Sequence, residues 1–138
     1  SYVSSRAFVW PNVKLGEHCF IFEDNTIQPF VQIGDNMVMW SGNHIGHHSR
    51  IGNDCFISSH VVVSGWCDIG ANCFLGVNAT LANNTKLGAA SWVMHGAITG
   101  GTIPEKSMIK SVKSEIVPLD EEALMRALER ASAKRTIS

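Results

Sequence analysis

Three of the chain's six histidines lie within five positions of one another, in the segment NHIGHHSRIG at residues 43–52. They are His44, His47 and His48. An imidazole can bind a metal ion, take up and return a proton near neutral pH, or simply decorate a surface. Which of these applies depends on the elements that position the three side chains.

An aliphatic residue recurs at every sixth position through most of the chain. The sixteen consecutive sites are Val3, Val9, Leu15, Ile21, Ile27, Ile33, Met39, Ile45, Ile51, Ile57, Val63, Ile69, Leu75, Leu81, Leu87 and Val93. Seven of these sites are followed by glycine, the residue four places later is mostly small, and turn pairs such as Asn53-Asp54 lie between them. Asn and Asp tolerate the left-handed backbone that a tight corner needs. A six-residue period of short strand and corner is typical of a parallel β-helix built from hexapeptides.

The repeat therefore predicts an all-β fold with the aliphatic and small side chains inward and the residue between them outward. Three successive hexads would make one coil, with one hexad on each side of a triangular prism. Residues 1–98 would form about five coils, roughly 25 Å tall at about 4.8 Å per layer. The pattern breaks at Thr99, and residues 99–119 are predicted to be closing strands and loop.

Residues 120–135 are predicted to form a C-terminal α-helix. Asp120 would cap its N-terminus, and acidic residues fill its first turn. An apolar stripe on the helix is expected to cover the last coil and protect an open strand edge. The stripe consists of Leu124, Ala127, Leu128 and Ala131.

Residues that occupy the same place three hexads apart would stack on successive coils, so that each outward site forms a column. One column is apolar and reads Tyr2, Phe20, Val38, Phe56, Phe74 and Trp92. Exposed patches of that size usually mark interfaces. The column therefore predicts a homo-oligomer, and coverage by an N-terminal domain is the alternative. His44 belongs to a mixed column at the margin of this interface, while the inward Asn25 and Asn43 would stack as a buried amide ladder.

Four cysteines occupy the small inward sites and are predicted to be reduced core residues. They are Cys19, Cys55, Cys67 and Cys73, and they show no CxxC spacing. Unpaired thiols suit a reducing compartment, which indicates the cytoplasm. The net charge of −1 offers no basic face, and the chain has no apolar run of transmembrane length. Neither nucleic acid nor a membrane is expected as a partner.

The segment from residue 43 to residue 88 resembles the nucleotide-sugar acetyltransferases among the hexapeptide-repeat acyltransferases. It reads NHIGHHSRIGNDCFISSHVVVSGWCDIGANCFLGVNATLANNTKLG. The group includes the sialic-acid O-acetyltransferases (NeuD-like) and the bacillosamine-pathway N-acetyltransferase. The resemblance covers residues 1 to about 105 and implies a left-handed β-helix, a homotrimer and acetyl-CoA as co-substrate. Members commonly carry a small α/β domain before the β-helix, and that domain is expected to be missing from this chain.

The resemblance also assigns roles to individual residues. The family's catalytic histidine lies in an Ile-x-His-x-x-x-Ile-Gly segment, which here runs from Ile45 to Gly52 and places the general base at His47. His48 stands where the family often has an acidic residue that orients the base. It is grouped with His47 as a catalytic candidate, and the orienting partner is left open. His44 and His60 are the candidates for binding the substrate.

Gly65 would lie one coil below His47, where the absent side chain would leave a notch for a substrate atom. The resemblance implies that backbone groups near Gly65 and Val77 contact the acyl donor, and an N–H near Gly65 could stabilise the oxyanion of acyl transfer. Lys110 and Lys113 could meet the phosphates of CoA, with plain solvated lysines as the alternative.

A metal site is another reading of the histidines. Some hexapeptide trimers, the γ-class carbonic anhydrases, bind zinc through three histidines. Here His60 and His95 come close to the spacing of the first two ligands, but Gly100 stands where the third should be. No metal is therefore expected, while surface decoration stays open for the cluster.

These features together predict an enzyme that moves an acetyl group from acetyl-CoA to the amine or hydroxyl of a sugar, with a nucleotide-linked sugar favoured and histidine as the general base. The alternative is a noncatalytic β-helix scaffold, or an oligomerisation module of a longer enzyme.

Overall fold

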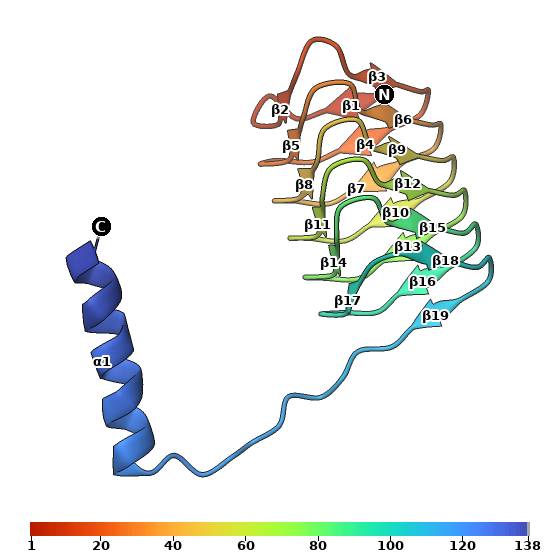
Figure 1. Ribbon diagram of the computed structural model, residues 1–138. Helices are drawn as coiled ribbons and strands as arrows, with labels where there is room; N and C mark the ends of the chain where they lie inside the picture. The colour runs from red at the N-terminus through yellow and green to blue at the C-terminus, as the bar shows by residue number, and fades with distance from the viewer. Residues whose placement is uncertain (138) are drawn as a thin grey trace.

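The computed structural model describes the backbone of residues 1–137 and the side chains of residues 1–133. The chain winds as a parallel β-helix and ends in one α-helix (Figure 1). Two-residue strands form three parallel sheets of seven, six and six strands, which are called sheets A, B and C here. The predicted β-helix with a C-terminal helix is confirmed.

The three sheets take every third strand in turn. Sheet A contains β1 (Tyr2–Val3), β4 (Phe20–Ile21), β7 (Val38–Met39), β10 (Phe56–Ile57), β13 (Phe74–Leu75), β16 (Trp92–Val93) and β19 (Met108–Ile109). Sheet B contains β2 (Phe8–Val9), β5 (Thr26–Ile27), β8 (His44–Ile45), β11 (Val62–Val63), β14 (Thr80–Leu81) and β17 (Ile98–Thr99). Sheet C contains β3 (Lys14–Leu15), β6 (Gln32–Ile33), β9 (Arg50–Ile51), β12 (Asp68–Ile69), β15 (Lys86–Leu87) and β18 (Thr102–Ile103).

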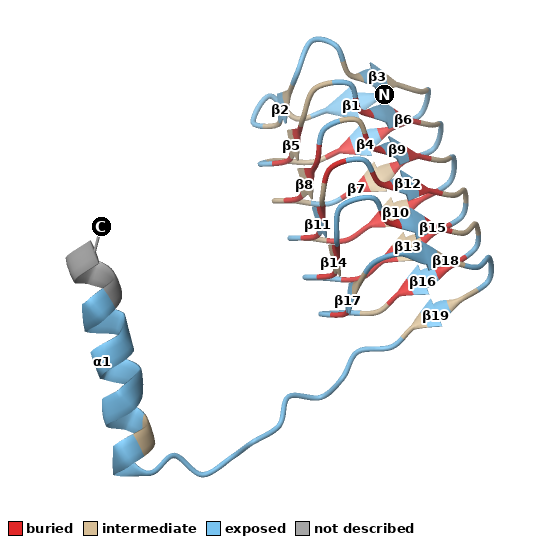
Figure 2. Ribbon diagram, in the orientation of Figure 1, coloured by how far each residue is buried: buried red, intermediate tan, exposed pale blue. Residues whose placement is uncertain are grey.

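The strand register confirms the predicted columns. Phe56 pairs with Phe74, and Ile57 pairs with Leu75, three hexads later in each case. The second residue of a strand points inward, so the aliphatic side chains of the middle turns are almost completely buried (Figure 2). A continuous apolar column therefore runs along the axis, and burial of this column is the main favourable term in the stability of the stack.

The corners between sheets repeat with the same period. From His18 onward, one residue in each corner has a positive φ, usually the residue just before the small inward one. Asn72, Asn78 and Asn84 occupy this place with φ near 60°, as expected from the tolerance of Asn for the left-handed region. The same place in other turns holds His48 and two bulky aromatic residues, which are considered with the site below.

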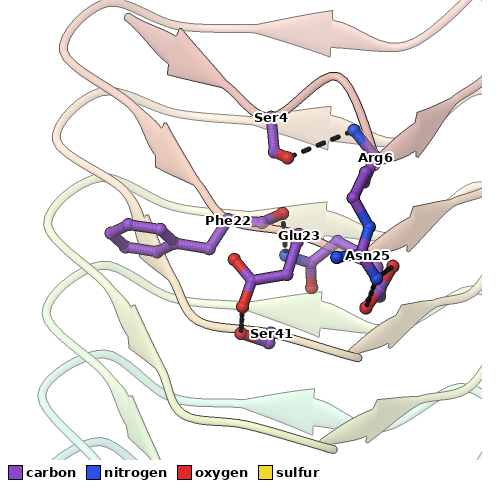
Figure 3. A network of polar contacts seen from close by, with 7 residues as sticks. Ser4, Arg6, Phe22, Glu23, Asn25 and Ser41 are labelled. Atoms are coloured by element: carbon purple, nitrogen blue, oxygen red, sulfur yellow. Dashed lines mark hydrogen bonds and ion pairs between the residues drawn. The ribbon is translucent and has the colours of Figure 1, made fainter.

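Asn25 and Asn43 form the predicted amide ladder inside the β-helix. The Asn25 side chain donates to the carbonyl oxygen of Phe22 at 2.9 Å (Figure 3). It also donates to Trp40 O (2.6 Å), and its Oδ1 accepts from the Asn43 N–H (3.0 Å). Asn43 in turn donates to Trp40 O (2.8 Å) and accepts from the Val61 N–H (2.7 Å). Both amides are therefore satisfied although both are buried.

The polar groups around this ladder tie neighbouring turns together on the outer surface. Ser41 donates to Glu23 (2.7 Å), and this hydrogen bond lowers the pKa of Glu23 (Figure 3). One turn earlier, the Arg6 guanidinium contacts both carboxylate oxygens of Asp24 at 3.0 and 2.9 Å. These exposed contacts fix side chains at the corner and contribute little to stability.

The β-helix continues beyond the point where the six-residue count stops. β17 and β18 are separated only by Gly100 and Gly101, so that Lys86 pairs with Thr102 and not with Pro104, the residue three hexads later. Gly101 has a φ of 77°, which lets this shortened corner turn sharply. The stack therefore has about six turns, one more than the sequence count, because the shortened corner puts the last strands out of phase.

The C-terminal helix α1 (Glu121–Ile137) begins as predicted. Asp120 Oδ1 accepts from the Ala123 N–H at 2.6 Å and caps the helix. The expectation that its apolar stripe covers the last turn is wrong, because Leu124 and Leu128 are 43% and 54% exposed. Residues 110–120 run extended away from β19, so the helix begins at a distance from the β-helix (Figures 1 and 2).

Replacing Asn43 with Leu should destabilise the protein, because the buried Val61 N–H would lose its acceptor. We expect a loss of about 1–3 kcal/mol in the free energy of unfolding, measured by urea denaturation. The exposed variant Lys86→Leu is the control and should change stability by no more than about 0.5 kcal/mol. Equal stability of Asn43→Leu and the native chain would contradict a structural role for the ladder.

Candidate functional site

His44, His47 and His48 lie on and just after β8, where the chain passes from sheet B to sheet C. His44 is the outward residue of β8 and lies half-buried between Thr26 and Val62 of the neighbouring strands. His47 and His48 form the following corner, which is called the B–C corner here. His47 is exposed and His48 is half-buried.

The two corner histidines contact each other directly. Their Nδ1 atoms lie 3.1 Å apart, so one ring must donate its proton and the other must accept it. The backbone N–H of His47 donates to Gln28 Oε1 at 2.9 Å, which fixes the start of the corner. With its Nδ1 engaged, His47 keeps Nε2 as its second reactive nitrogen.

His48 is held between two aromatic rings of the adjacent turns. Its ring stacks on Trp66 with centroids 4.1 Å apart and an interplanar angle of 8°. Phe30 stacks on the opposite side at 4.9 Å and 27°. Phe30 and Trp66 are called the aromatic clamp below.

The predicted notch beside His47 is filled by the imidazole itself. A Cβ placed on Gly65 would lie 2.8 Å from His47 Nε2 and 2.9 Å from its Cε1. The same Cβ would lie only 3.4 Å from His47 Cδ2, so the glycine lies against the face of the ring and not in line with Nε2. Gly65 therefore makes room for the ring, and the expectation of an empty space for a substrate atom is wrong.

The backbone donors near Gly65 are already paired. The Gly65 N–H donates to Asn83 Oδ1 at 2.9 Å, and the Trp66 N–H donates to His47 O at 2.9 Å. An oxyanion could use the Gly65 N–H only if the Asn83 side chain moved away. The Gly65 N–H is therefore occupied by Asn83 in this structure.

His60 and Val77 lie at a different corner, where sheet A passes to sheet B. His60 lies against Gly42, since a Cβ on that glycine would meet the imidazole at 2.6 Å. The Val77 N–H donates to His95 Nδ1 at 2.9 Å. The two B–C corner histidines and this second corner thus lie at opposite ends of the short strands of sheet B, so one chain does not gather all the candidate residues in one place.

The described residues form neither a metal-binding site nor an accessible thiol. No group of three or more His, Cys, Asp or Glu side chains in the described chain is placed to hold a metal ion. All four cysteines are free and buried, as predicted. The hydrogen bond between Cys55 and Cys73 raises the pKa of Cys55 and lowers that of Cys73 to about 7, but Cys73 is only 2% exposed and no substrate can reach it.

Lys110 and Lys113 lie in the extended segment after β19, and both are exposed. The segment leaves the β-helix after its last strand (Figure 1). The aromatic clamp was missed in the sequence analysis, although it left a signal there. Phe30, His48 and Trp66 follow one another at intervals of three hexads and therefore belong to one corner column.

One segment of the chain matches a known family of hexapeptide repeats. Residues 48–83 match the family model described as bacterial transferase hexapeptide (six repeats). The match covers this segment of a chain whose fold is a parallel β-helix. No curated protein sequence matches the chain.

Several solved structures share the β-helix. A variant of perosamine N-acetyltransferase from Caulobacter crescentus, in complex with CoA and GDP-perosamine, is 25% identical with a TM-score of 0.76 over 80% of this chain and 56% of that one. The acetyltransferase domain of PglB from Neisseria gonorrhoeae, in complex with acetyl coenzyme A, is 20% identical with a TM-score of 0.75 over 77% of this chain and 52% of that one. AntD, an N-acyltransferase from Bacillus cereus, is 12% identical with a TM-score of 0.65 over 95% and 87%.

The chain spans about half the length of the perosamine N-acetyltransferase and of the PglB acetyltransferase domain. The helix in the described part of the chain is neither long enough nor apolar enough to cross a membrane.

Replacing Gly65 with Ala should displace the His47 ring, because the new methyl group would lie 2.8 Å from Nε2. We expect the His47 imidazole NMR signals to shift while the stack stays folded, since the far end of a side chain can move. Gly100→Ala is the matched control, because its new methyl group would meet the Ala82 methyl group at 3.1 Å and would not touch His47. Unchanged His47 signals in Gly65→Ala would show that the ring does not lie on this glycine in solution.

Proposed function

We propose that the chain is the catalytic β-helix of an acetyltransferase that moves an acetyl group from acetyl-CoA to a sugar. The observation that carries the proposal is the exposed His47 imidazole, whose Nδ1 is engaged by His48 at 3.1 Å while Nε2 stays available. The similarity to perosamine N-acetyltransferase supports the same activity. A free basic nitrogen on a fixed ring is what a general base requires.

The proposed reaction is direct transfer without an acyl-enzyme. The amine or hydroxyl of the sugar attacks the thioester carbonyl carbon, and His47 Nε2 takes the proton that the attacking atom loses. The carbon–sulfur bond then breaks, and the CoA thiolate leaves and receives that proton as a thiol. The buried cysteines play no part, because none of them can reach a substrate.

The oxyanion that forms during attack needs a hydrogen-bond donor. In the proposed mechanism the Gly65 N–H serves this role after the Asn83 amide swings away. Asn83 is exposed, so its side chain has room to move, and the developing anion offers the N–H a stronger acceptor than a neutral amide.

The acceptor is proposed to be a nucleotide-linked sugar. The perosamine enzyme whose structure holds GDP-perosamine supports this class. His44 and His60 are proposed to contact the sugar. Val77, Lys110 and Lys113 are proposed to contact acetyl-CoA, the two lysines through its phosphates.

The proposed catalytic and binding residues lie at two different corners of one chain. They can therefore meet in one site only if two copies of the chain lie side by side. The outward column of sheet A provides a surface for such an assembly. It is called the apolar ladder here and consists of Tyr2, Phe20, Val38, Phe56, Phe74, Trp92 and Met108. Ring contacts run along it, with Phe74 5.6 Å from Phe56 and 5.2 Å from Trp92. We propose a homotrimer in which the ladder is covered.

The middle of the ladder is less open than the sequence suggests. Phe56 and Phe74 are half-buried, because Trp40 and His95 at the corner lean against them with ring centroids 6.5 and 6.3 Å apart. Tyr2, Phe20 and Trp92 stay about half exposed. A large apolar surface is thus still available for a second copy.

The four reduced thiols are compatible with a reducing compartment, and we propose the cytoplasm as the location of the protein.

The variant His47→Ala should lower kcat by about 10²–10⁴-fold, because the general base would be lost. Activity is measured as release of free CoA thiol with nucleotide-linked amino sugars, and acetyl-CoA binding is measured by calorimetry. Binding should survive in the variant. Native activity in His47→Ala would remove the base from this residue, and failure of the native chain to bind acetyl-CoA would favour a noncatalytic scaffold.

Light scattering should give a native mass of three times the 15.0 kDa of one chain. Trp92→Glu should reduce this mass towards that of a single chain, because a charge on the covered ladder would be buried without a partner. Lys86→Glu on the outer face of sheet C is the matched control and should leave the mass unchanged. A native mass equal to one chain would defeat the assembly.

A further inference from the structure

We infer that His48 is a positioning residue: it holds His47 in the tautomer that leaves the Nε2 lone pair free, and the aromatic clamp of Phe30 and Trp66 holds His48 in place. The inference rests on the proposed function, because it concerns the base of that reaction. It answers a question raised by the sequence, which places a neutral histidine where an acidic partner for the base was expected.

The backbone of the corner is the first observation. Phe30, His48 and Trp66 have φ values of 64°, 61° and 60°. This left-handed region is an outlier for bulky side chains such as Phe and Trp, whereas His adopts it more readily. Equivalent corners in this chain use Asn72, Asn78 and Asn84. The two large aromatic rings on either side of His48 in one column therefore point to a requirement that outweighs local preference.

Stacking is the second observation. The His48 ring lies between Trp66 at 4.1 Å and Phe30 at 4.9 Å, and it is nearly parallel to the indole. A ring held on both faces keeps its plane fixed, and turning it over would exchange Nδ1 for a carbon. The clamp holds the ring in this plane, and the contact with His47 selects the flip that directs Nδ1 of His48 at His47. His47 has no such stacked restraint from the indole, since its ring meets Trp66 edge-on at 6.3 Å.

The contact between the two Nδ1 atoms is the third observation. At 3.1 Å the rings share one proton. When that proton resides on His47, its Nε2 carries the lone pair that the reaction needs. When His47 then takes the substrate proton at Nε2, its Nδ1–H still donates to His48, and the hydrogen bond becomes charge-assisted and stronger. The His48 imidazole thereby orients His47 as a carboxylate would.

Two variants separate positioning from packing. His48→Asn keeps an acceptor oxygen near the place of Nδ1 but removes the stacked ring, and Asn already fits the B–C corner at residue 84. His48→Phe keeps the stack but removes the acceptor, and Phe fits the same corner at residue 30. Both variants should therefore fold, which circular dichroism and native mass would verify.

For His48→Phe we expect kcat to fall about 10–100-fold, the usual loss when the partner that orients a functional histidine is removed. His48→Asn keeps the acceptor but loses the stacking on the clamp, so its kcat should lie between that of His48→Phe and that of the native chain, and acetyl-CoA affinity should change in neither variant. A packing role predicts the reverse order, with His48→Phe near native and His48→Asn impaired, and that order would overturn the inference.

A measurement without substrate tests the tautomer directly. Long-range ¹H–¹⁵N NMR of the free native protein should show His47 protonated at Nδ1, and His48→Phe should shift His47 towards a mixture of tautomers. Protonation of native His47 at Nε2 would overturn the inference even in an active enzyme. Failure of the native protein to transfer acetyl groups would instead count against the proposed function and leave this NMR result standing.

Discussion

The structure depends on a constant register: up to the shortened corner at Gly100-Gly101, each turn of the β-helix is three hexads long. Parallel strands with only two residues each bury little on their own, so stability comes from stacking the same kind of residue on each turn. This register fills the axis with aliphatic side chains. It also places every corner residue over its counterpart in the next turn, so the surface columns follow from the same constraint as the core.

The site at the B–C corner is a product of that stacking. His47 rests on Gly65 because the two residues share a column, and His48 lies between Phe30 and Trp66 for the same reason. No short sequence motif holds these five residues together, since they come from three turns. A chemically useful arrangement is thus assembled from residues that are distant along the chain and adjacent along the axis.

The sequence predicts the parts of this protein that depend on the repeat. The β-helix, the inward cysteines, the Asn25–Asn43 ladder and the apolar ladder all follow from counting in single hexads and in groups of three. The count fails at Gly100-Gly101, because a shortened corner keeps the stack but changes the phase. The helix stripe also misleads, because amphipathic spacing does not reveal where an extended connection will carry the helix.

The finer features of the site lie beyond what spacing can predict. The column of Phe30, His48 and Trp66 can be read from the sequence, but the near-parallel rings and the contact between the two Nδ1 atoms depend on side-chain rotamers. In the same way, nothing in the sequence indicates that the Gly65 N–H donates a hydrogen bond to the Asn83 side chain. Column membership is set by the backbone period, whereas tautomers and hydrogen-bond partners are set by local geometry.

The position of β8 within its sheet has a consequence for dynamics. It is the third strand from one end of sheet B and the fourth from the other, so intact turns flank the histidine corner on both sides. In a solenoid, opening starts at the exposed ends and moves inward. Amide hydrogens around His47 and His48 should therefore exchange with solvent more slowly than those of the first and last turns, and fraying at either end can occur without disturbing the imidazoles.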